Sequence, residues 1–487
     1  MQAAIQRLGL IGLVATLSLA GCGGMLKKQP VVPSPATTAI PAFAPSKTAV
    51  VKPGLAIERW WLVFSDPALE RLMDEALARN EDLESAVARV REAQATLDVA
   101  GAAQSPTLDL QAGAKRAQDT TVGARPLPPG VDRRASSHQI ALAAGYELDL
   151  WGRLSSLSAA ARNQLLAAGW ARAAVEWGLT ARLAEAYFNL VAVDRQIEIS
   201  ESVRASRATT LKLRQREHAA GAGTELDMRR AEAELSGTEA TLAGLTRQRI
   251  AFERALTVLL GRTPTEIAEG SLPRAWLDES KPYASVLPQG AAAELLVRRP
   301  DVRQAEAQLA AANANIEAAR AATLPSLKLS GTLGSDARSI GNLFSGPAMI
   351  FSLVATAAQS IADGGKARAR VREEHARAEQ ALTNYRKVIA SAVLDVRETY
   401  LTLDANQQSL LSQRDRVIAL ARAREIARVS FDNGVLNYLD VLDAERNWYQ
   451  AQLDQVSAYK DQLTGQVAAF KALGGGYTPI DVQANRN

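Results

Sequence analysis

The chain contains one pattern twice, and the second copy reads NGVLNYLDVLDAERN from Asn433 to Asn447. The first copy reads AGAGTELDMRRAEA from Ala220 to Ala233. When Gly434 is placed over Gly221, a separation of 213 positions, the leucine, aspartate, alanine and glutamate that follow coincide as well. Only the second copy adds an acid at Asp443. A recurrence at this distance predicts duplication of a large unit, because solenoid repeats have periods of roughly 20–50 residues.

The duplication extends over most of the chain. At the same separation the following residues pair: Gly152 with Gly365, Tyr187 with Tyr400, and Leu190 with Leu403. Further upstream, LDVAGAAQSPTLDL at 97–110 resembles IEAARAATLPSLKL at 316–329, with a separation of 219. Each half therefore has the order helix, proline, segment of a different pattern, glycine, long helix, glycine-rich turn and helix.

Long helices dominate both halves. The stretches Arg153–Ala219 and Lys366–Phe431 contain no proline, and each predicts a helix of about 100 Å. Such lengths suit a rod or a shaft better than a compact domain, and a simple coiled-coil rod is the alternative at this point. Shorter helices are predicted at Pro67–Gln104, Glu225–Leu260, 290–323 and Tyr438–Leu473.

The segments between the proline and the glycine alternate with a period of two, which is the period of a β-strand. Apolar residues take every second position, most clearly from Leu108 and from Gln139, and less cleanly in the second half. The predicted strands are 108–115, 139–149, 327–334 and 349–354. Strands of roughly ten residues with one apolar face are what a transmembrane β-barrel needs. Soluble β-hairpins remain the alternative.

Four strands cannot close a barrel, and an open sheet edge is not viable in hydrocarbon. If the strands cross a membrane, several copies must therefore share one barrel. Two copies would give eight strands, whose side chains roughly fill the interior, and three would give twelve strands around a wider pore. The long helices of the same copies would meet beneath it.

The N-terminus reads as a signal peptide over residues 1–21, with Arg7 followed by an apolar run. It ends in Leu-Ala-Gly before Cys22, the only cysteine, so no intramolecular disulfide can form. We predict cleavage before Cys22 and lipidation of that residue, which anchors the mature chain to a membrane. Gly23 follows, and by the sorting pattern of bacterial lipoproteins it predicts the outer membrane. An ordinary signal peptide with an incidental cysteine is the alternative.

Little else in the 487 residues suggests chemistry. The net charge is +4, and no basic patch with interleaved aromatics indicates nucleic acid. The three histidines, His138, His218 and His375, lack metal-ligand spacing. No phosphate loop, nucleophile elbow or zinc-protease motif is present. The sequence therefore predicts neither an enzyme nor a bound metal, and no cofactor beyond the lipid on Cys22.

Five stretches resemble the TolC-like outer-membrane efflux factors, in their lipoprotein (NodT-type) branch. They are WWLVFSDPALERLMDEAL (60–77), YELDLWGRL (146–154), AEAYFNLVA (184–192), LLVRRPDVRQAEAQLAAANANIEAAR (295–320) and YLDVLDAERNWYQAQ (438–452). The resemblance implies a mixed α and β membrane protein, a homotrimer with a twelve-stranded β-barrel in the outer membrane continued by a periplasmic α-helical barrel. It also implies a passive duct that docks to a periplasmic adaptor and an inner-membrane pump of the resistance–nodulation–division type.

The doubled motif would then form the two helical tips in the periplasm. Gly221, Gly223 and Gly434 would let the long helices turn back, because glycine adopts backbone conformations that other residues resist. By position in the motif, the resemblance assigns the gate to Asp440 and Asp443. An acid ring in a narrow neck attracts cations and repels anions.

The sequence offers candidates for the residues that surround Asp440 and Asp443. Leu436 stands where some relatives carry a basic latch residue, so other partners would hold the gate shut. Asp227 and Phe431 are candidates for its neighbourhood. For Asp440 and Asp443, a solvated helix face is the alternative.

We predict this organisation: residues 1–21 signal peptide, 22–58 lipidated N-terminus and Pro-rich tether, 59–260 first repeat, 261–289 inter-repeat linker, 290–473 second repeat and 474–487 C-terminal tail. The predicted function is an exit duct for drugs or other small molecules. The alternatives are a lipid-anchored periplasmic scaffold without a pore, or a duct for metal ions or secreted proteins.

Overall fold

The computed structural model describes residues 50–52, 59–120, 132–263, 265–266, 272–275, 277, 286–288 and 298–474. The predicted signal peptide, Cys22, most of the tether and nearly all of the C-terminal tail lie outside the described residues. So does the start of the helix predicted from residue 290.

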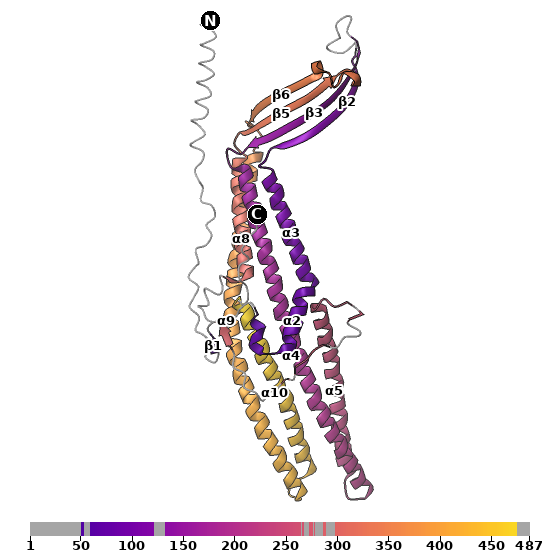
Figure 1. Ribbon diagram of the computed structural model, residues 1–487. Helices are drawn as coiled ribbons and strands as arrows, with labels where there is room; N and C mark the ends of the chain where they lie inside the picture. Colours follow the sequence, from indigo (N-terminus) through magenta and orange to yellow (C-terminus); the bar gives the residue numbers. More distant parts are fainter. Residues whose placement is uncertain are drawn as a thin grey trace.

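The molecule is elongated, with a β-sheet at one end, helices along its length and two helical hairpin tips at the other end (Figure 1). The first repeat consists of α2 (Pro67–Arg79), α3 (Glu81–Ala102), β2 (Thr107–Gln118), β3 (Arg134–Leu148), α4 (Arg153–Ala219) and α5 (Glu225–Leu259). The second consists of α8 (Pro300–Ala321), β5 (Ser326–Ala337), β6 (Met349–Ala358), α9 (Lys366–Asp432) and α10 (Tyr438–Ala472). Smaller elements are β1 (Val50–Lys52), which pairs with β4 (Val286–Pro288), and the 3-10 turns η1 (Trp60–Phe64), η2 (Ile340–Asn342) and η3 (Gly346–Ala348).

The four longer strands form one antiparallel sheet in the order β2-β3-β5-β6. Its register places one apolar row across all four strands: Leu110, Leu142, Leu333 and Phe351. The neighbouring row, on the opposite face, is Asp109, Ala143, Thr332 and Ser352. The predicted two-faced strands are therefore confirmed, and they share a common apolar face.

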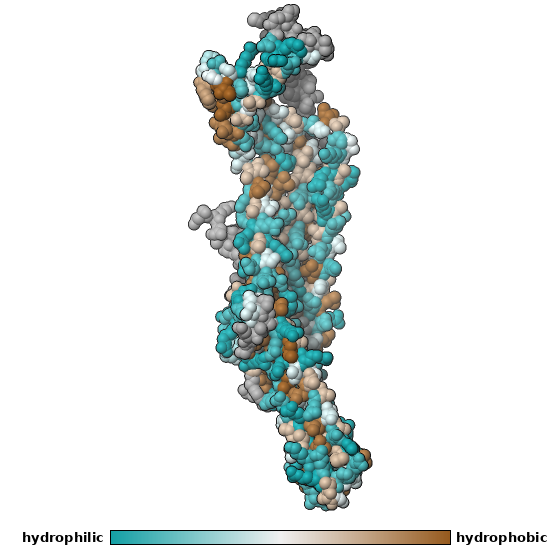
Figure 2. Space-filling model, turned by 90° about the vertical axis from the view of Figure 1, so that its right-hand side faces the viewer, coloured by the Kyte–Doolittle hydropathy of each residue, from teal (hydrophilic) through white to brown (hydrophobic). Residues whose placement is uncertain are grey.

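This apolar face is uncovered within one protomer. Leu110 is 69% exposed, Leu333 56% and Phe351 81%. Figure 2 shows hydrophobic side chains gathered at the sheet end, above a shaft whose visible surface is largely hydrophilic. The outer strands β2 and β6 are each paired on one side only among the described residues. The sheet thus has an apolar face and two open edges.

The two long helices agree with the sequence prediction, but the helix predicted from Pro67 to Gln104 is wrong as a single element. It divides at Asn80, whose ψ of 125° leaves the helical region. The Asn80 side chain accepts a hydrogen bond from the Leu83 amide at 3.1 Å and donates one to the Leu259 carbonyl at 2.9 Å. Asn80 therefore ends α2 and caps α3, and it does so against the end of α5.

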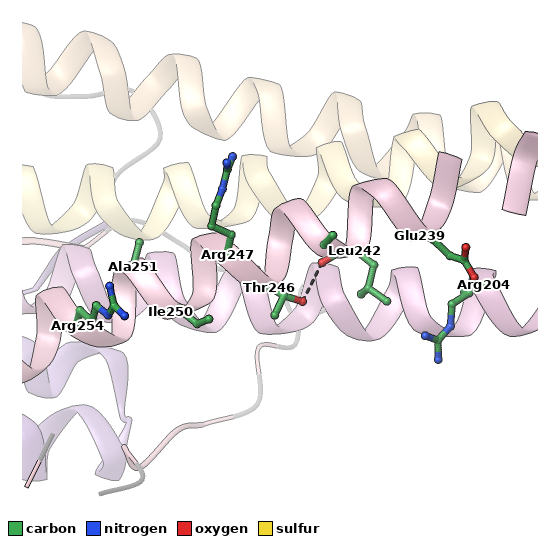
Figure 3. Close-up of a pocket in the computed structure, with 9 residues that line it drawn as sticks. Arg204, Glu239, Leu242, Thr246, Arg247, Ile250, Ala251 and Arg254 are labelled. Atoms are coloured by element: carbon green, nitrogen blue, oxygen red, sulfur yellow. Dashed lines mark hydrogen bonds between the residues drawn. The ribbon is translucent and has the colours of Figure 1, made fainter. Parts of the chain in front are cut away.

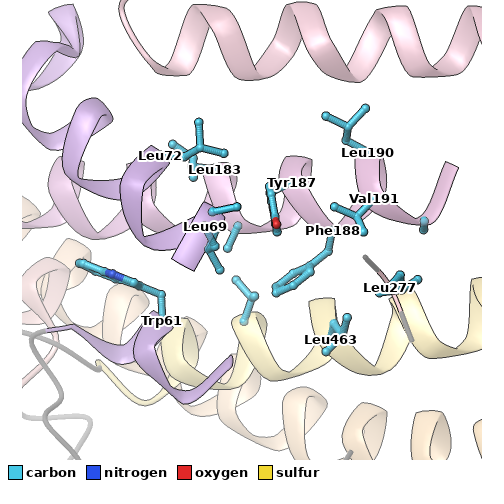
Figure 4. Packing of buried hydrophobic residues seen from close by; sticks show 14 of the residues in the cluster. Trp61, Leu69, Leu72, Leu183, Tyr187, Phe188, Leu190, Val191, Leu277 and Leu463 are labelled. Carbon is cyan, nitrogen blue, oxygen red and sulfur yellow. The ribbon is translucent and has the colours of Figure 1, made fainter. Parts of the chain in front are cut away.

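The main core lies midway along the shaft, where α2, α4 and α10 meet (Figure 4). Tyr187 is buried there. Its hydroxyl donates to Asp66 Oδ2 at 2.6 Å and accepts from the Ala275 amide at 3.0 Å. The same hydrophobic cluster includes side chains from several elements: Trp61, Leu69, Leu183, Phe188, Leu463 and Phe470. This core fixes α10 against α4, so the two hairpins below it start from a common base.

Below the core, α4 and α5 form the first hairpin, and α9 and α10 form the second (Figure 1). Helices α4 and α10 contact each other, so the two hairpins lie side by side. Within the described residues, no helix combines the length and the apolar character that crossing a membrane requires.

Candidate functional site at the hairpin tips

Both hairpin turns depend on a glycine in the left-handed region. Gly221 has φ of 71° and Gly434 has φ of 75°, values that other residues adopt only with strain. Gly223 differs from the prediction, because its φ is not positive. A Cβ at Gly223 would instead lie 3.1 Å from the Cβ of Glu217, so close packing explains this glycine.

The two return helices begin with matching caps. Asn437 Oδ1 accepts a hydrogen bond from the Asp440 amide at 3.1 Å, and the Asn437 amide donates to Asp440 Oδ2 at 3.3 Å, which completes a capping box. In the first hairpin, Thr224 Oγ1 accepts from the Asp227 amide at 3.1 Å and donates to Asp227 Oδ2 at 2.6 Å. Each repeated aspartate therefore stabilises the start of a helix.

Asp443 has no such role in the structure of the turn. Its side chain is 64% exposed and lies 3.5 Å from the nearest Arg446 nitrogen and 3.4 Å from Asn447 Nδ2. Its counterpart in the first hairpin is Arg230, which pairs with Asp227 at 3.4 Å. The first two turns of α10 thus carry two exposed acids, of which Asp443 pairs with Arg446. At the position that matches Asp443, α5 carries a base that pairs with Asp227 instead.

A cluster that we call the tip clamp joins the two hairpins: Arg214, Glu217, Phe431 and Tyr438. The Arg214 guanidinium lies 4.3 Å from the centroid of the Tyr438 ring and 5.1 Å from that of Phe431. Its Nη1 lies 2.6 Å from Glu217 Oε2. A guanidinium at these distances is attracted to the ring faces. One side chain of α4 therefore contacts both α9 and α10.

Tyr438 is the most buried member of the tip clamp. Burial raises the pKa of its hydroxyl above the usual range, the nearby Arg214 opposes this, and the charges of Glu445 and Asp227 add to it. The hydroxyl is therefore neutral at physiological pH. A neutral phenol packs against the apolar side chains of Val441 and Leu442 without the cost of a buried charge.

Further polar contacts join the hairpins above the tip clamp. Glu234 of α5 lies 2.9 Å from Arg207 of α4 and 3.9 Å from Arg446 of α10. The Arg207 guanidinium lies 5.5 Å from the Tyr449 ring centroid, and the Tyr449 hydroxyl lies 2.8 Å from Ser200 Oγ. Separating the second hairpin from the first would break the contacts that Glu234, Arg207 and Ser200 make with α10, together with the contacts of Arg214 in the tip clamp.

The structure brings some of the predicted gate residues together and separates others. Asp440 and Asp443 lie in the first two turns of α10, and Phe431 lies beside Tyr438 in the tip clamp. Asp227 lies on the other hairpin, and no ion pair or hydrogen bond joins it to either acid among the described residues. Sequence reasoning missed Arg214, because nothing distinguishes it from the other charges of its helix.

The shaft also has an open groove along α5 with a volume of about 790 Å³ (Figure 3). Its lining includes the apolar Leu242 and Ile250 and three arginines, Arg204, Arg247 and Arg254. None of the predicted gate residues lines it. In the described part of the chain, no group of three or more His, Cys, Asp or Glu side chains is arranged to hold a metal ion.

The profile of the family described as "Outer membrane efflux protein" matches residues 72–262 and 291–475. The chain is 34% identical over 416 residues to the solvent efflux pump outer membrane protein SrpC of Pseudomonas putida. This match covers 85% of this chain and 87% of that protein. It is 31% identical to the pyoverdine export outer membrane protein OpmQ of Pseudomonas aeruginosa, over 97% of both chains. A crystal structure of a membrane protein from Pseudomonas aeruginosa superposes with a TM-score of 0.82 at 29% identity, over 92% of this chain and 98% of the other.

Proposed function

The chain belongs to the outer membrane efflux protein family and is the outer-membrane channel of a tripartite efflux system, and we propose that three copies of it form one exit duct that closes at the hairpin tips. Transport is its role in that system, and nothing in the described residues suggests a reaction.

The sheet carries the argument for three copies. Its apolar row across four strands suits a lipid-facing surface, and the opposite row suits a wet interior. The free edges of β2 and β6 leave backbone groups that only another copy could pair in hydrocarbon. Because β6 of one copy would run antiparallel to β2 of the next, the alternation of strand direction continues around the ring. Three copies give a twelve-stranded barrel with room for a pore, whereas eight strands would roughly be filled by side chains.

The tips provide the gate in this proposal. In a trimer, Asp440 and Asp443 would each occur three times around the axis, close enough to attract cations. Asp440 accepts a hydrogen bond as part of the helix cap, whereas Asp443 is 64% exposed and makes a 3.5 Å ion pair with Arg446 of its own helix. The tip clamp would hold the second hairpin against the first in the closed duct. Opening would separate Arg214 from the two rings.

The remaining parts of the assembly follow from the family. We propose that a periplasmic adaptor joins the duct to an inner-membrane pump of the resistance–nodulation–division type, which supplies the energy. The lipid on Cys22 would add an anchor in the outer membrane, and mass spectrometry of the mature N-terminus would test it against Cys22→Ser. The names of the two relatives, which refer to solvent efflux and pyoverdine export, support small organic molecules as the cargo.

Single-channel conductance in a planar bilayer tests the duct and its gate together. We expect a small or flickering current from the wild-type protein and a larger, steadier one from Asp440→Ala/Asp443→Ala. Asp227→Ala is the matched control, because it removes the corresponding acid from the other hairpin. A large current from all three proteins would keep the duct and remove these acids from the gate. No current from inserted, folded protein would contradict the duct.

A further inference from the structure

The first two turns of α9 are unusually basic. Lys366, Arg368, Arg370 and Arg372 fall within seven residues, and the first turn contains no acid. Arg370 is neutralised by Glu373 at 2.8 Å and by a second glutamate at 2.9 Å. The other three side chains are exposed, and among the described residues none of them has an ion pair. We call Lys366, Arg368 and Arg372 the basic collar.

The positive charge of the basic collar lies at the end of α9 where the helix dipole is also positive. The N-terminal end of a helix is partially positive, so cations there are disfavoured. Helices α2, α3, α5, α8 and α10 all have an acid in the first turn. The matching helix α4 starts with one cation, Arg153, which is paired with Glu147 at 2.7 Å. The nearby carboxylate of Asp363 accepts hydrogen bonds from the Gly365 and Ala367 amides. The Asp363 carboxylate is thus engaged by backbone amides, and among the described residues no acid forms an ion pair with the basic collar.

The position of the basic collar identifies what would compensate it. Strand β6 ends at Ala358, eight residues before Lys366. At the same end of the sheet, Trp151 donates from its indole nitrogen to the Pro325 carbonyl at 2.7 Å, and Ile361 is 99% exposed. Tryptophan is enriched at the bilayer interface, so the exposed Trp151 beside the ends of the strands suits that level. From Lys366 to Arg372 the helix rises about 9 Å, which is comparable to the depth of a headgroup layer.

We propose that the basic collar binds the phosphate groups of anionic phospholipids in the leaflet that faces the helical shaft. Arg368 and Arg372 are four residues apart, so they lie on one face of α9 and can share one headgroup layer. Lys366 adds a third cation at the start of the helix. If the basic collars of three copies faced the lumen, nine cations would lie around one duct and would repel one another. If they face the lipid, the phosphate groups of the headgroups neutralise them. The inference rests on the proposed function, because it needs the sheet to be in the membrane.

Quenching of Trp151 fluorescence tests this proposal in the full-length protein. The protein is reconstituted in vesicles that contain brominated phosphatidylglycerol or brominated phosphatidylcholine, and Trp151→Phe identifies the reporter signal. Trp170 lies about 26 Å along α4 from the first residue of that helix, and Trp177 lies further along it. Both are therefore beyond the reach of the bilayer. We expect wild-type protein to prefer the anionic lipid. Lys366→Gln/Arg368→Gln/Arg372→Gln should reduce the relative binding constant roughly fivefold for each cation removed.

The matched control is Arg386→Gln/Lys387→Gln/Arg397→Gln, which removes the same charge from exposed positions of the same helix. These positions begin about 30 Å further along α9, so the control should keep the lipid preference. An unchanged preference in the collar variant, or an equal loss in the control, would overturn the proposal. So would a change of ion selectivity in the collar variant with intact lipid preference, because that places the cations in the lumen. If neither lipid quenches Trp151, the sheet is not in the bilayer and the proposed function itself fails.

Discussion

The tip of the α4–α5 hairpin and the tip of the α9–α10 hairpin have the same turn and different charges. Both use a glycine in the left-handed region, an N-cap side chain and an aspartate three residues later. Among the positions that differ are those that supply the tip clamp and the second acid of α10. In the order first tip, second tip they are Arg214 and Ala427, His218 and Phe431, Glu225 and Tyr438, and Arg230 and Asp443. The two copies thus share the left-handed glycine and the helix cap, and they differ at Arg214, Phe431 and Tyr438, through which one tip contacts the other.

Replacing Arg214 by Ala should have the largest effect, because it removes the side chain through which α4 contacts both rings of the second tip. Cation–π contacts contribute about 1–2 kcal/mol each when partly desolvated. Loss of two should raise the open probability of the duct by at least about tenfold. Single-channel recording measures it. Arg216→Ala is the control, since Arg216 is exposed two residues away on the same helix. Equal effects of the two substitutions would remove the tip clamp from the gate.

The left-handed glycines that the two tips share should respond alike to substitution by alanine. Gly434→Ala and Gly221→Ala each force a side chain into the left-handed region, at a cost of about 1–2 kcal/mol. Amide hydrogen exchange in the turn measures the local stability that is lost. We expect the two costs to agree, because φ is 71° at one glycine and 75° at the other. A much larger loss at Gly434 would mean that contacts with the first hairpin, rather than the turn itself, hold the second tip in place.

The two acids of α10 should separate into a structural and an electrostatic role. Asp443→Asn should lower the preference of the duct for cations over anions by about twofold, because an exposed carboxylate in water contributes only modestly. Asp440→Asn should lower the stability of the first turn as well. Reversal potentials in a salt gradient measure the preference, and Arg230→Gln tests the matching position of the first tip. If Arg230→Gln shifts the reversal potential as much as Asp443→Asn, the charge difference between the tips has no role in selectivity.

Local patterns were enough to predict the parts of this molecule that depend on neighbours in sequence. Helix α4 begins and ends at the predicted residues, because a glycine precedes it and a glycine-rich turn follows it. The strands were located by alternation, and pairing with their neighbours extends β2 to Gln118. The break at Asn80 was missed because it depends on a hydrogen bond to Leu259, far along the chain. Arg214 was missed for the same reason, since helical periodicity marks a buried face and not the partner that covers it.

The smallest predicted effect is a pH dependence confined to the second tip. Burial raises the pKa of Tyr438 above its usual value of 10.0, and Glu445 and Asp227 add to this while Arg214 opposes it. A raised pKa means that the closed clamp favours the neutral phenol. Its contribution to closure is therefore complete below pH of about 10 and is lost as the pH rises towards the raised value. Open probability should be constant between about pH 7 and 9 and should rise above about pH 10. Tyr438→Phe keeps the ring over Arg214 and removes the titration, so its open probability should stay constant through the same range. A rise that persists in Tyr438→Phe would assign the alkaline opening to another group, and Tyr438 would then serve the clamp through its ring alone.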